Sequence, residues 1–139
     1  MENWRVRELK VTQTLRTDLF ISADHTIIIE KENKKSRLIV SIRSGESTLR
    51  KEVATYYSPI SNSAFTRDGL YFVVRGSQSV IIYDCLTWEP SKIVNVSCEL
   101  VQDSEDFLRA IFVNNGLYEY NEETIAMLKD MGEREEIDS

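Results

Sequence analysis

Short apolar runs separated by turn-forming residues dominate the first 113 positions of the chain. Residues 4–11 alternate apolar and polar side chains over eight positions, a pattern typical of a half-buried strand. Further β-prone runs follow at residues 19–21, 26–29, 38–42, 53–57, 70–74, 80–83, 93–96, 108–113 and 117–120. About ten strands at intervals of roughly 8–12 residues are typical of an all-β domain. In the sixth and seventh runs, we expect Phe72, Val74, Val80 and Ile82 to be buried on paired strands.

Turn-forming residues predict how these strands connect. Asp68-Gly69 and Asn115-Gly116 are the best local hairpin signals, because these residue types tolerate positive φ. Polar or glycine-containing segments predict further turns at residues 23–25, 31–35, 43–46 and 76–79. The first of these turns would place His25 between two strands.

The C-terminal residues change to a helical pattern. Asn121 can cap a helix over residues 121–131, since an Asn side chain accepts a hydrogen bond from a free amide of the first turn. Gly132 is predicted to end this helix in a left-handed conformation. Residues 133–139 are then expected to form a mobile acidic tail.

One face of the predicted helix is apolar. Ile125, Leu128 and Met131 recur every three residues and form a stripe that we expect to pack on the sheet. The elements together predict an all-β fold, an antiparallel meander or sandwich, with one C-terminal α-helix. With 139 residues the chain has room for one domain, which we expect to span residues 1–132.

The middle of the chain carries turn and strand signals in a distinctive order. Asp68-Gly69 precedes an apolar strand, Gly76-Ser77 begins a turn, and a second apolar strand ends in Tyr83-Asp84. In this order residues 66–90 resemble one blade of a WD-repeat or related β-propeller, although Tyr-Asp replaces Trp-Asp and the Gly-His dipeptide is absent. A similar turn and strand pattern lies about 44 residues before this segment, at residues 22–29, and another about 47 residues after it, at residues 115–120, a spacing typical of a four-stranded blade. The resemblance implies a blade-like meander, but propellers close with four or more blades and this chain holds three at most.

Charge is unevenly distributed along the chain. The formal net charge is −6, from 17 basic and 23 acidic side chains. Residues 1–96 hold 14 basic and 11 acidic side chains, a net of +3, whereas residues 97–139 hold 3 and 12, a net of −9. Such an acidic C-terminal segment either binds a basic partner or serves only to keep the protein soluble. Because an acidic protein is repelled by phosphates, we expect no nucleic-acid partner.

Compartment signals are few. The apolar runs are far shorter than the ~18–20 residues of a membrane span, and the N-terminal residues lack the apolar region of a signal peptide. We therefore expect a cytoplasmic protein with no membrane partner. Cys85 and Cys98 are expected to be reduced thiols, one or both of them buried. Without an export signal, the glycosylation sequon at Asn95-Val96-Ser97 is a chance match.

The sequence supports no particular catalytic or metal chemistry. His25 is the single histidine and lacks a recognisable nucleophile motif around it. One histidine and two cysteines cannot fill the four-ligand shell of structural zinc, and residues 103–106 lack the glycine-centred calcium loop. We therefore expect no enzymatic activity and no cofactor or metal.

Basic side chains gather in two N-terminal segments: Arg5, Arg7 and Lys10 beside Trp4, and Lys31, Lys34, Lys35 and Arg37. They are able to contact phosphates, but charges of this kind also protect an edge strand from aggregation. Given the acidic chain, we interpret them as edge protection.

By elimination, the sequence favours a non-enzymatic protein-binding domain. The most concrete hypothesis is a small acidic neutralising protein of the immunity type, which binds and inhibits a basic toxin or nuclease. The alternative is a structural or assembly domain that self-associates through a strand edge. The expected partner-binding residues are acids and tyrosines of the C-terminal third: Asp103, Glu105, Asp106, Tyr118, Glu119, Tyr120, Glu122 and Glu123.

Overall fold

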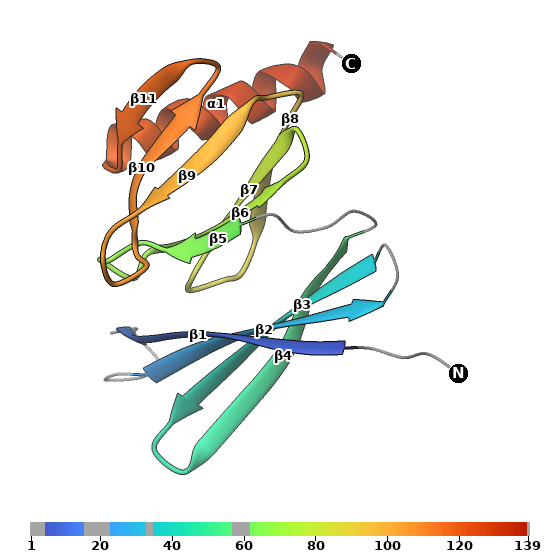
Figure 1. Cartoon of the computed structure of the whole chain (residues 1–139), viewed down its shortest axis with the longest axis vertical. Helices are drawn as coiled ribbons and strands as arrows, with labels where there is room; N and C mark the ends of the chain where they lie inside the picture. The colour runs from blue at the N-terminus through green and yellow to red at the C-terminus, as the bar shows by residue number, and fades with distance from the viewer. Residues whose placement is uncertain (1–4, 16–22, 33–34, 57–61, 139) are drawn as a thin grey trace. The chain divides into compact units, whose positions relative to one another are not determined.

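The computed structural model describes residues 5–15, 23–32, 35–56 and 62–138, with side chains described for residues 26–27, 36–43, 45–53 and 62–133. These residues form eleven strands and one C-terminal helix (Figure 1), which confirms the predicted all-β fold with a C-terminal helix. The strands make three antiparallel sheets. The chain divides into two compact units, Met1–Pro59 and Ile60–Ser139.

The N-terminal unit is a four-stranded antiparallel meander in chain order. Its strands are β1 (Arg5–Leu15), β2 (Ala23–Glu32), β3 (Lys35–Ser44) and β4 (Ser47–Tyr56). Ile27 and Val40 are opposite each other in the β2–β3 register and are fully buried, as is Leu38. Gly45 takes a φ of 61° in the β3–β4 turn, where a glycine relieves the strain of a left-handed backbone.

The predicted turn at residues 23–25 is wrong. Ala23, Asp24 and His25 belong to β2, where His25 lies opposite Ile42 of β3. The continuous pairing of β2 with β3 from Asp24 to Glu32 outweighs the local turn preference of Asp24. The strand predicted at residues 19–21 lies outside the described residues, as does Trp4.

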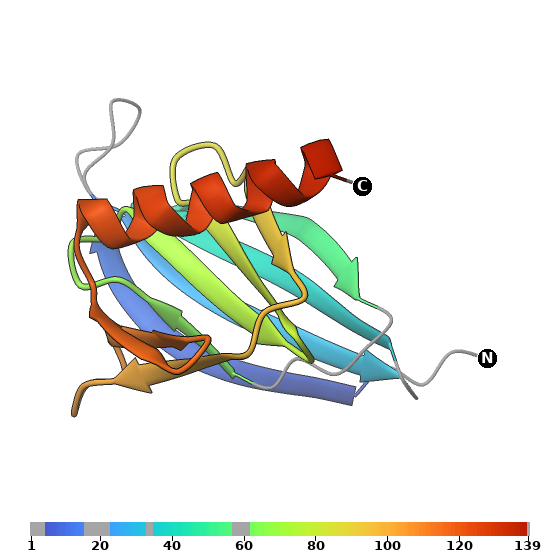
Figure 2. The ribbon, with the colours of Figure 1, turned by 90° about the horizontal axis from the view of Figure 1, so that it is seen from above.

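The C-terminal unit combines two sheets and the helix. A four-stranded meander contains β5 (Asn62–Phe65), β6 (Tyr71–Gly76), β7 (Ser79–Asp84) and β8 (Pro90–Val94). A three-stranded sheet in the order β11-β10-β9 contains β9 (Cys98–Gln102), β10 (Leu108–Val113) and β11 (Gly116–Glu119). Helix α1 (Glu122–Asp138) follows and lies along β8 (Figure 2). Residues 66–90 thus belong to a four-stranded meander, the arrangement that the blade resemblance implies.

One hydrophobic core joins the two sheets and the helix of this unit. It contains side chains from each sheet and from the helix, among them Val73, Ile82, Leu100, Ile111 and Leu128. The predicted burial of Phe72, Val74, Val80 and Ile82 is confirmed, since each is at most 1% exposed.

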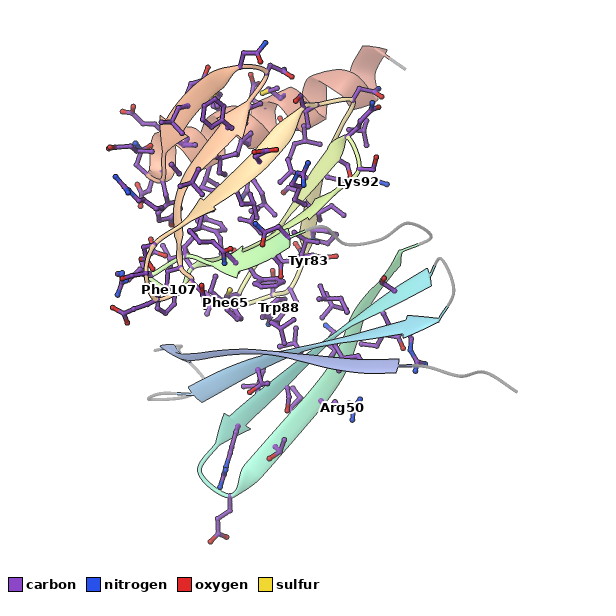
Figure 3. The ribbon with its side chains drawn as sticks, viewed as in Figure 1. Arg50, Phe65, Tyr83, Trp88, Lys92 and Phe107 are labelled. Carbon is purple, nitrogen blue, oxygen red and sulfur yellow. The ribbon has the colours of Figure 1, made fainter. Side chains whose placement is uncertain are left out.

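A second buried cluster on the β5–β8 sheet is aromatic. The ring centroids of Phe65 and Phe72 lie 4.7 Å apart, and the Trp88 ring lies 6.1–6.4 Å from those of Phe65, Phe72 and Tyr83. Figure 3 shows Phe65 and Trp88 side by side below β5. β6 and β7 contribute side chains to both clusters and are buried almost throughout, which explains their continuous apolar runs.

The helix differs from its prediction at the C-terminal end. It continues through Gly132 to Asp138, so that residues 133–138 are helical and Gly132 is no C-cap. Gly132 instead permits close packing: a Cβ at this position would lie 2.8 Å from the carbonyl oxygen of Lys92 on β8. The predicted stripe is confirmed, with Ile125 and Leu128 buried and Met131 partly buried against the core.

Candidate functional site

Antiparallel topology brings three connections of the C-terminal unit to one end, which we call the acidic end. It comprises the β5–β6 turn (residues 66–70), the β9–β10 loop with the start of β10 (residues 103–109), and the β11–α1 junction with the first helical turn (residues 119–123). A parallel bridge joins Thr66 to Leu108, and the Tyr120 amide donates to the Arg109 carbonyl at 2.9 Å. Segments far apart in the sequence are therefore fixed next to one another.

The β9–β10 loop is organised by Asp103. Its carboxylate accepts hydrogen bonds from the amides of Glu105 (2.8 Å) and Phe107 (3.1 Å). Its own amide donates to the Phe107 carbonyl at 2.8 Å, and Asp106 takes a φ of 67°. Asp103 thus has a structural role, whereas Glu105 and Asp106 are carried on the exposed tip of the loop.

Arg67 pairs with the acids of this loop. Its Nη2 lies 2.6 Å from Asp103 Oδ2 and 3.4 Å from Glu105 Oε1. Its guanidinium stands 4.8 Å from the centre of the Phe107 ring, the residue labelled at the tip of the loop in Figure 3. The hydrogen bond from Arg67 lowers the pKa of Asp103 below its ordinary value, and the same bond raises the pKa of Arg67.

Tyr120 links the helix junction to the β5–β6 turn. Its side chain is half-buried against the core, and its hydroxyl donates to Asp68 Oδ2 at 2.5 Å. Burial, followed by this hydrogen bond, raises the pKa of Tyr120 well above its ordinary value. Asp68 also accepts from the Leu70 amide (3.0 Å) and from the Thr66 hydroxyl (2.6 Å), which fixes the Asp-Gly turn.

The predicted helix cap is confirmed. Asn121 Oδ1 accepts a hydrogen bond from the Thr124 amide at 2.8 Å, and the Thr124 hydroxyl donates to the Glu119 carbonyl at 2.7 Å. Glu122 and Glu123 are exposed in the first turn. Their carboxylates complement the helix dipole there.

The structure gathers seven of the eight predicted site residues at the acidic end. Tyr118 lies one step further along β11, opposite Ile111, and is 39% exposed. Sequence reasoning missed Arg67 and Asp68 as members of this group. The Asp68-Gly69 turn signal was recognised, but only the sheet topology shows that this turn meets the β9–β10 loop.

The other candidate residues stand apart from this end or carry no reactive signature. Cys85 and Cys98 are buried and free, as expected. Burial raises the pKa of both thiols, that of Cys98 to about 11 and that of Cys85 further. The side chains of His25 and of the basic residues of β1 are outside the described residues.

Two further features, a metal-ligand cluster and a membrane-spanning helix, are absent from the described residues. Within the side chains that the structure describes, no group of three or more His, Cys, Asp or Glu residues is arranged to hold a metal ion. In the described part of the chain, no helix is both long enough and apolar enough to cross a membrane.

Comparison of the chain with protein-family models, with curated proteins and with solved structures gives no match.

Proposed function

We propose that the acidic end of the C-terminal unit binds a basic protein without catalysis. The observation that supports this proposal is the concentration of carboxylates at one end of a strongly acidic unit. Residues 60–139 hold 15 acidic and 6 basic side chains, a net of −9, whereas residues 1–59 hold 8 and 11, a net of +3.

The acids available to a partner are those with exposed side chains, and Glu105 is among them although it also lies 3.4 Å from Arg67. Glu105, Asp106, Glu119, Glu122 and Glu123 are all exposed. A set of exposed carboxylates on one side of a small unit attracts a cationic surface and accelerates its association. The competing explanation for Glu122 and Glu123 is a local one, since each contributes about 0.3–1 kcal/mol to the helix through its dipole.

The finer form of the proposal names the partner's class. A row of carboxylates presented by a folded unit can replace the phosphates that a basic nuclease or toxin binds, and so block its nucleic-acid surface. This is the immunity-type function, in which fast association depends on charge and tight binding on complementary packing.

The test is a pair of matched triple variants of the full chain. The first, Glu105→Gln with Glu122→Gln and Glu123→Gln, neutralises the acidic end and leaves Asp103 and Asp68 intact. The second, Glu46→Gln with Glu99→Gln and Glu133→Gln, removes the same charge from three exposed positions elsewhere. Basic proteins captured from the native host by the wild-type chain are purified, and their association rates are measured at low and physiological salt.

At low salt, we expect the first variant to associate about tenfold or more slowly than wild type, because steering contributes factors of 10 to 10³. The difference should shrink at physiological salt, where the screening length is about 8 Å. The second variant should stay close to wild type. Salt-insensitive association, or equal slowing by both variants, would contradict the proposal.

A second candidate function rests on the sheet edge. Among the described strands, β11 pairs only with β10, and Phe112 and Leu117 form a cross-strand pair that is 42% and 58% exposed. An open edge beside an apolar pair favours self-association. Sedimentation at rising concentration tests this, since a dimer that is abolished by Leu117→Lys supports it and a monomer throughout excludes it.

A further inference from the structure

The opposite end of the C-terminal unit holds a cavity of a different character. Three connections meet there: the β6–β7 turn (residues 77–78), the β8–β9 link (residues 95–97) and the β10–β11 turn (residues 114–115). We call this the polar end. Backbone hydrogen bonds join its connections, from the Val96 amide to the Gln78 carbonyl (3.3 Å) and from the Asn114 amide to the Ser97 carbonyl (2.9 Å).

The cavity at the polar end has a volume of about 570 Å³. Small-molecule sites typically have volumes of roughly 300–1,000 Å³. Most of its lining is uncharged and polar, from side chains of all three connections: Ser77, Gln78, Asn95, Ser97 and Asn114. Val96 and Cys98, both buried, and Arg75 complete it.

Arg75 is the charged residue of this lining. It is half-buried, and its Nε donates a hydrogen bond to the carbonyl oxygen of Cys98, which fixes the plane of the guanidinium. Among the side chains that the structure describes, no carboxylate forms an ion pair with Arg75, in contrast to Arg67 at the acidic end. The Cys98 thiol, whose pKa burial raises to about 11, is neutral at physiological pH and leaves the positive charge of Arg75 in place.

The backbone of the lining is also held in place. Gln78, Asn95 and Asn114 all have left-handed conformations, with φ values of 55°, 57° and 47°. Asn adopts this conformation more readily than most residues, and Gln does so less readily. The hydrogen bond from the Ser97 amide to Asn114 Oδ1 (3.2 Å) further connects two of the segments. The carboxamide side chains of Gln78, Asn95 and Asn114 are therefore carried by tight turns that hydrogen bonds join to one another.

We propose that this cavity binds a small hydroxylated anion, such as a sugar acid or a sugar phosphate. The anionic group would be held by the Arg75 guanidinium, whose planar donors suit carboxylate and phosphate oxygens. The hydroxyl groups would exchange hydrogen bonds with the serine hydroxyls and the carboxamides, which both donate and accept. This site is independent of the proposed protein-binding function, because it lies at the other end of the unit.

The experiment is an NMR titration of the full chain, labelled with ¹⁵N, using four probes. Gluconate and glucose 6-phosphate carry hydroxyls with a carboxylate or a phosphate, glucose carries hydroxyls alone, and inorganic phosphate carries the anion alone. We expect saturable shifts of the amides at residues 77–78 and 95–97 with gluconate or glucose 6-phosphate. The response to each identifies which anionic group the site prefers.

Glucose and inorganic phosphate are both expected to bind at least tenfold more weakly than the better hydroxylated anion. Equal binding of glucose would show that Arg75 does not select an anion, and equal binding of inorganic phosphate would show that the hydroxyls are not recognised. Either result overturns the proposal. So does the lack of saturable shifts with all four probes at tens of millimolar.

Two variants place a negative charge in the lining, the first of them with almost no change of shape. Asn95→Asp keeps a residue that tolerates positive φ, and Ser77→Asp places a turn-favouring residue in the β6–β7 turn. Both should weaken binding of the anion by tenfold or more while the remaining amide spectrum is preserved. Asn121→Asp is the matched control, since it adds the same charge at the acidic end and retains the helix cap. An unchanged affinity in both lining variants, or equal weakening by the control, would overturn the proposal.

Discussion

The two ends of the C-terminal unit are built on the same strands and are both joined by backbone hydrogen bonds, but they differ in the side chains that their connections carry. At the acidic end, the carboxylates of Asp103 and Asp68 accept amide hydrogen bonds, and Arg67 pairs with carboxylates. At the polar end, the Asn114 carboxamide accepts an amide hydrogen bond, and Arg75 bonds to a carbonyl oxygen. One end therefore carries a surplus of carboxylates, whereas the other has a cavity whose charged lining residue is Arg75.

This difference shows that the strands and the connections serve separate purposes. The buried residues of β6, β7, β10 and α1 form one core that supports both ends. The connections carry the polar groups that distinguish the ends, as is usual for loops on a rigid scaffold. Substitutions in the core should thus disturb both ends, and substitutions in the connections only one.

The largest effect is expected from Ile82→Ala. Ile82 lies on β7 opposite Val73 and is 1% exposed in the common core. Loss of a buried branched side chain with the cavity left behind typically costs about 2–5 kcal/mol. Chemical denaturation should show this loss, and amide exchange should accelerate at both ends. Leu86→Ala, at a position 59% exposed, is the control and should stay within about 0.5 kcal/mol of wild type. Faster exchange at only one end would mean that the ends do not share a core.

Gly132→Ala should have the next largest effect. It should destabilise the fold, although helix propensity alone favours alanine over glycine. In an exposed helix, Gly→Ala stabilises by about 0.5–1 kcal/mol. Here the new methyl group would lie 2.8 Å from the Lys92 carbonyl oxygen and 3.2 Å from Ile93 Cγ1, so α1 must move away from β8. Overpacking of this kind costs about 1–3 kcal/mol. Ala126→Gly, at an exposed position of the same helix, calibrates the propensity effect. A stabilised Gly132→Ala variant would show that α1 does not pack closely on β8.

Sequence patterns predicted much of this fold because local and tertiary preferences agree there. The alternating and continuous apolar runs identified β6, β7 and β10, and the Asn-Gly and Asp-Gly dipeptides identified the turns beside them. The runs at Asn62–Phe65 and Cys98–Gln102 were missed, since each is only four or five residues long and mixes polar with apolar positions. His25 was misplaced because cross-strand pairing, which a single segment does not reveal, decided its conformation.

The candidate sites were harder to predict than the strands. Residue type and charge identified the acids of the C-terminal third, but could not separate Asp103, which organises its loop, from Glu105, which is exposed. The cavity at the polar end has no sequence signature, because its lining comes from three connections that only the sheet topology brings together. Gly132 was read as a cap for the same reason, since the β8 backbone beside it lies about 40 residues away in sequence.

A smaller and local effect is expected at the helix cap. Asn121→Ala removes the acceptor for the Thr124 amide and should cost about 1 kcal/mol. Amide exchange should accelerate in the first turn of α1 while residues 77–78 and 95–97 keep their protection. Asn121→Asp retains the acceptor and should restore wild-type exchange. If the two variants behaved alike, the cap would contribute nothing measurable to the acidic end.

The smallest effect concerns the ion pair that distinguishes the two arginines. The hydrogen bond from Arg67 is the largest cause of the lowered pKa of Asp103, and the amides of Glu105 and Phe107 add to it. A carboxyl whose pKa is lowered by folding stabilises the folded state above its unfolded pKa, and this contribution is lost as pH falls through the folded pKa. The affected pH range is therefore below about pH 4, the ordinary range of an aspartate.

In Arg67→Met the Asp103 pKa should rise part of the way to its ordinary value, since both amide hydrogen bonds remain. The measurement is a ¹³C titration of the Asp103 carboxyl, with Arg109→Met as a control that removes another exposed arginine of the acidic end. The titration midpoint of Asp103 should not stay unchanged in Arg67→Met, nor move equally in both variants. Either result would show that the Arg67–Asp103 hydrogen bond does not persist in solution. Arg67 would then resemble Arg75 in having no carboxylate partner.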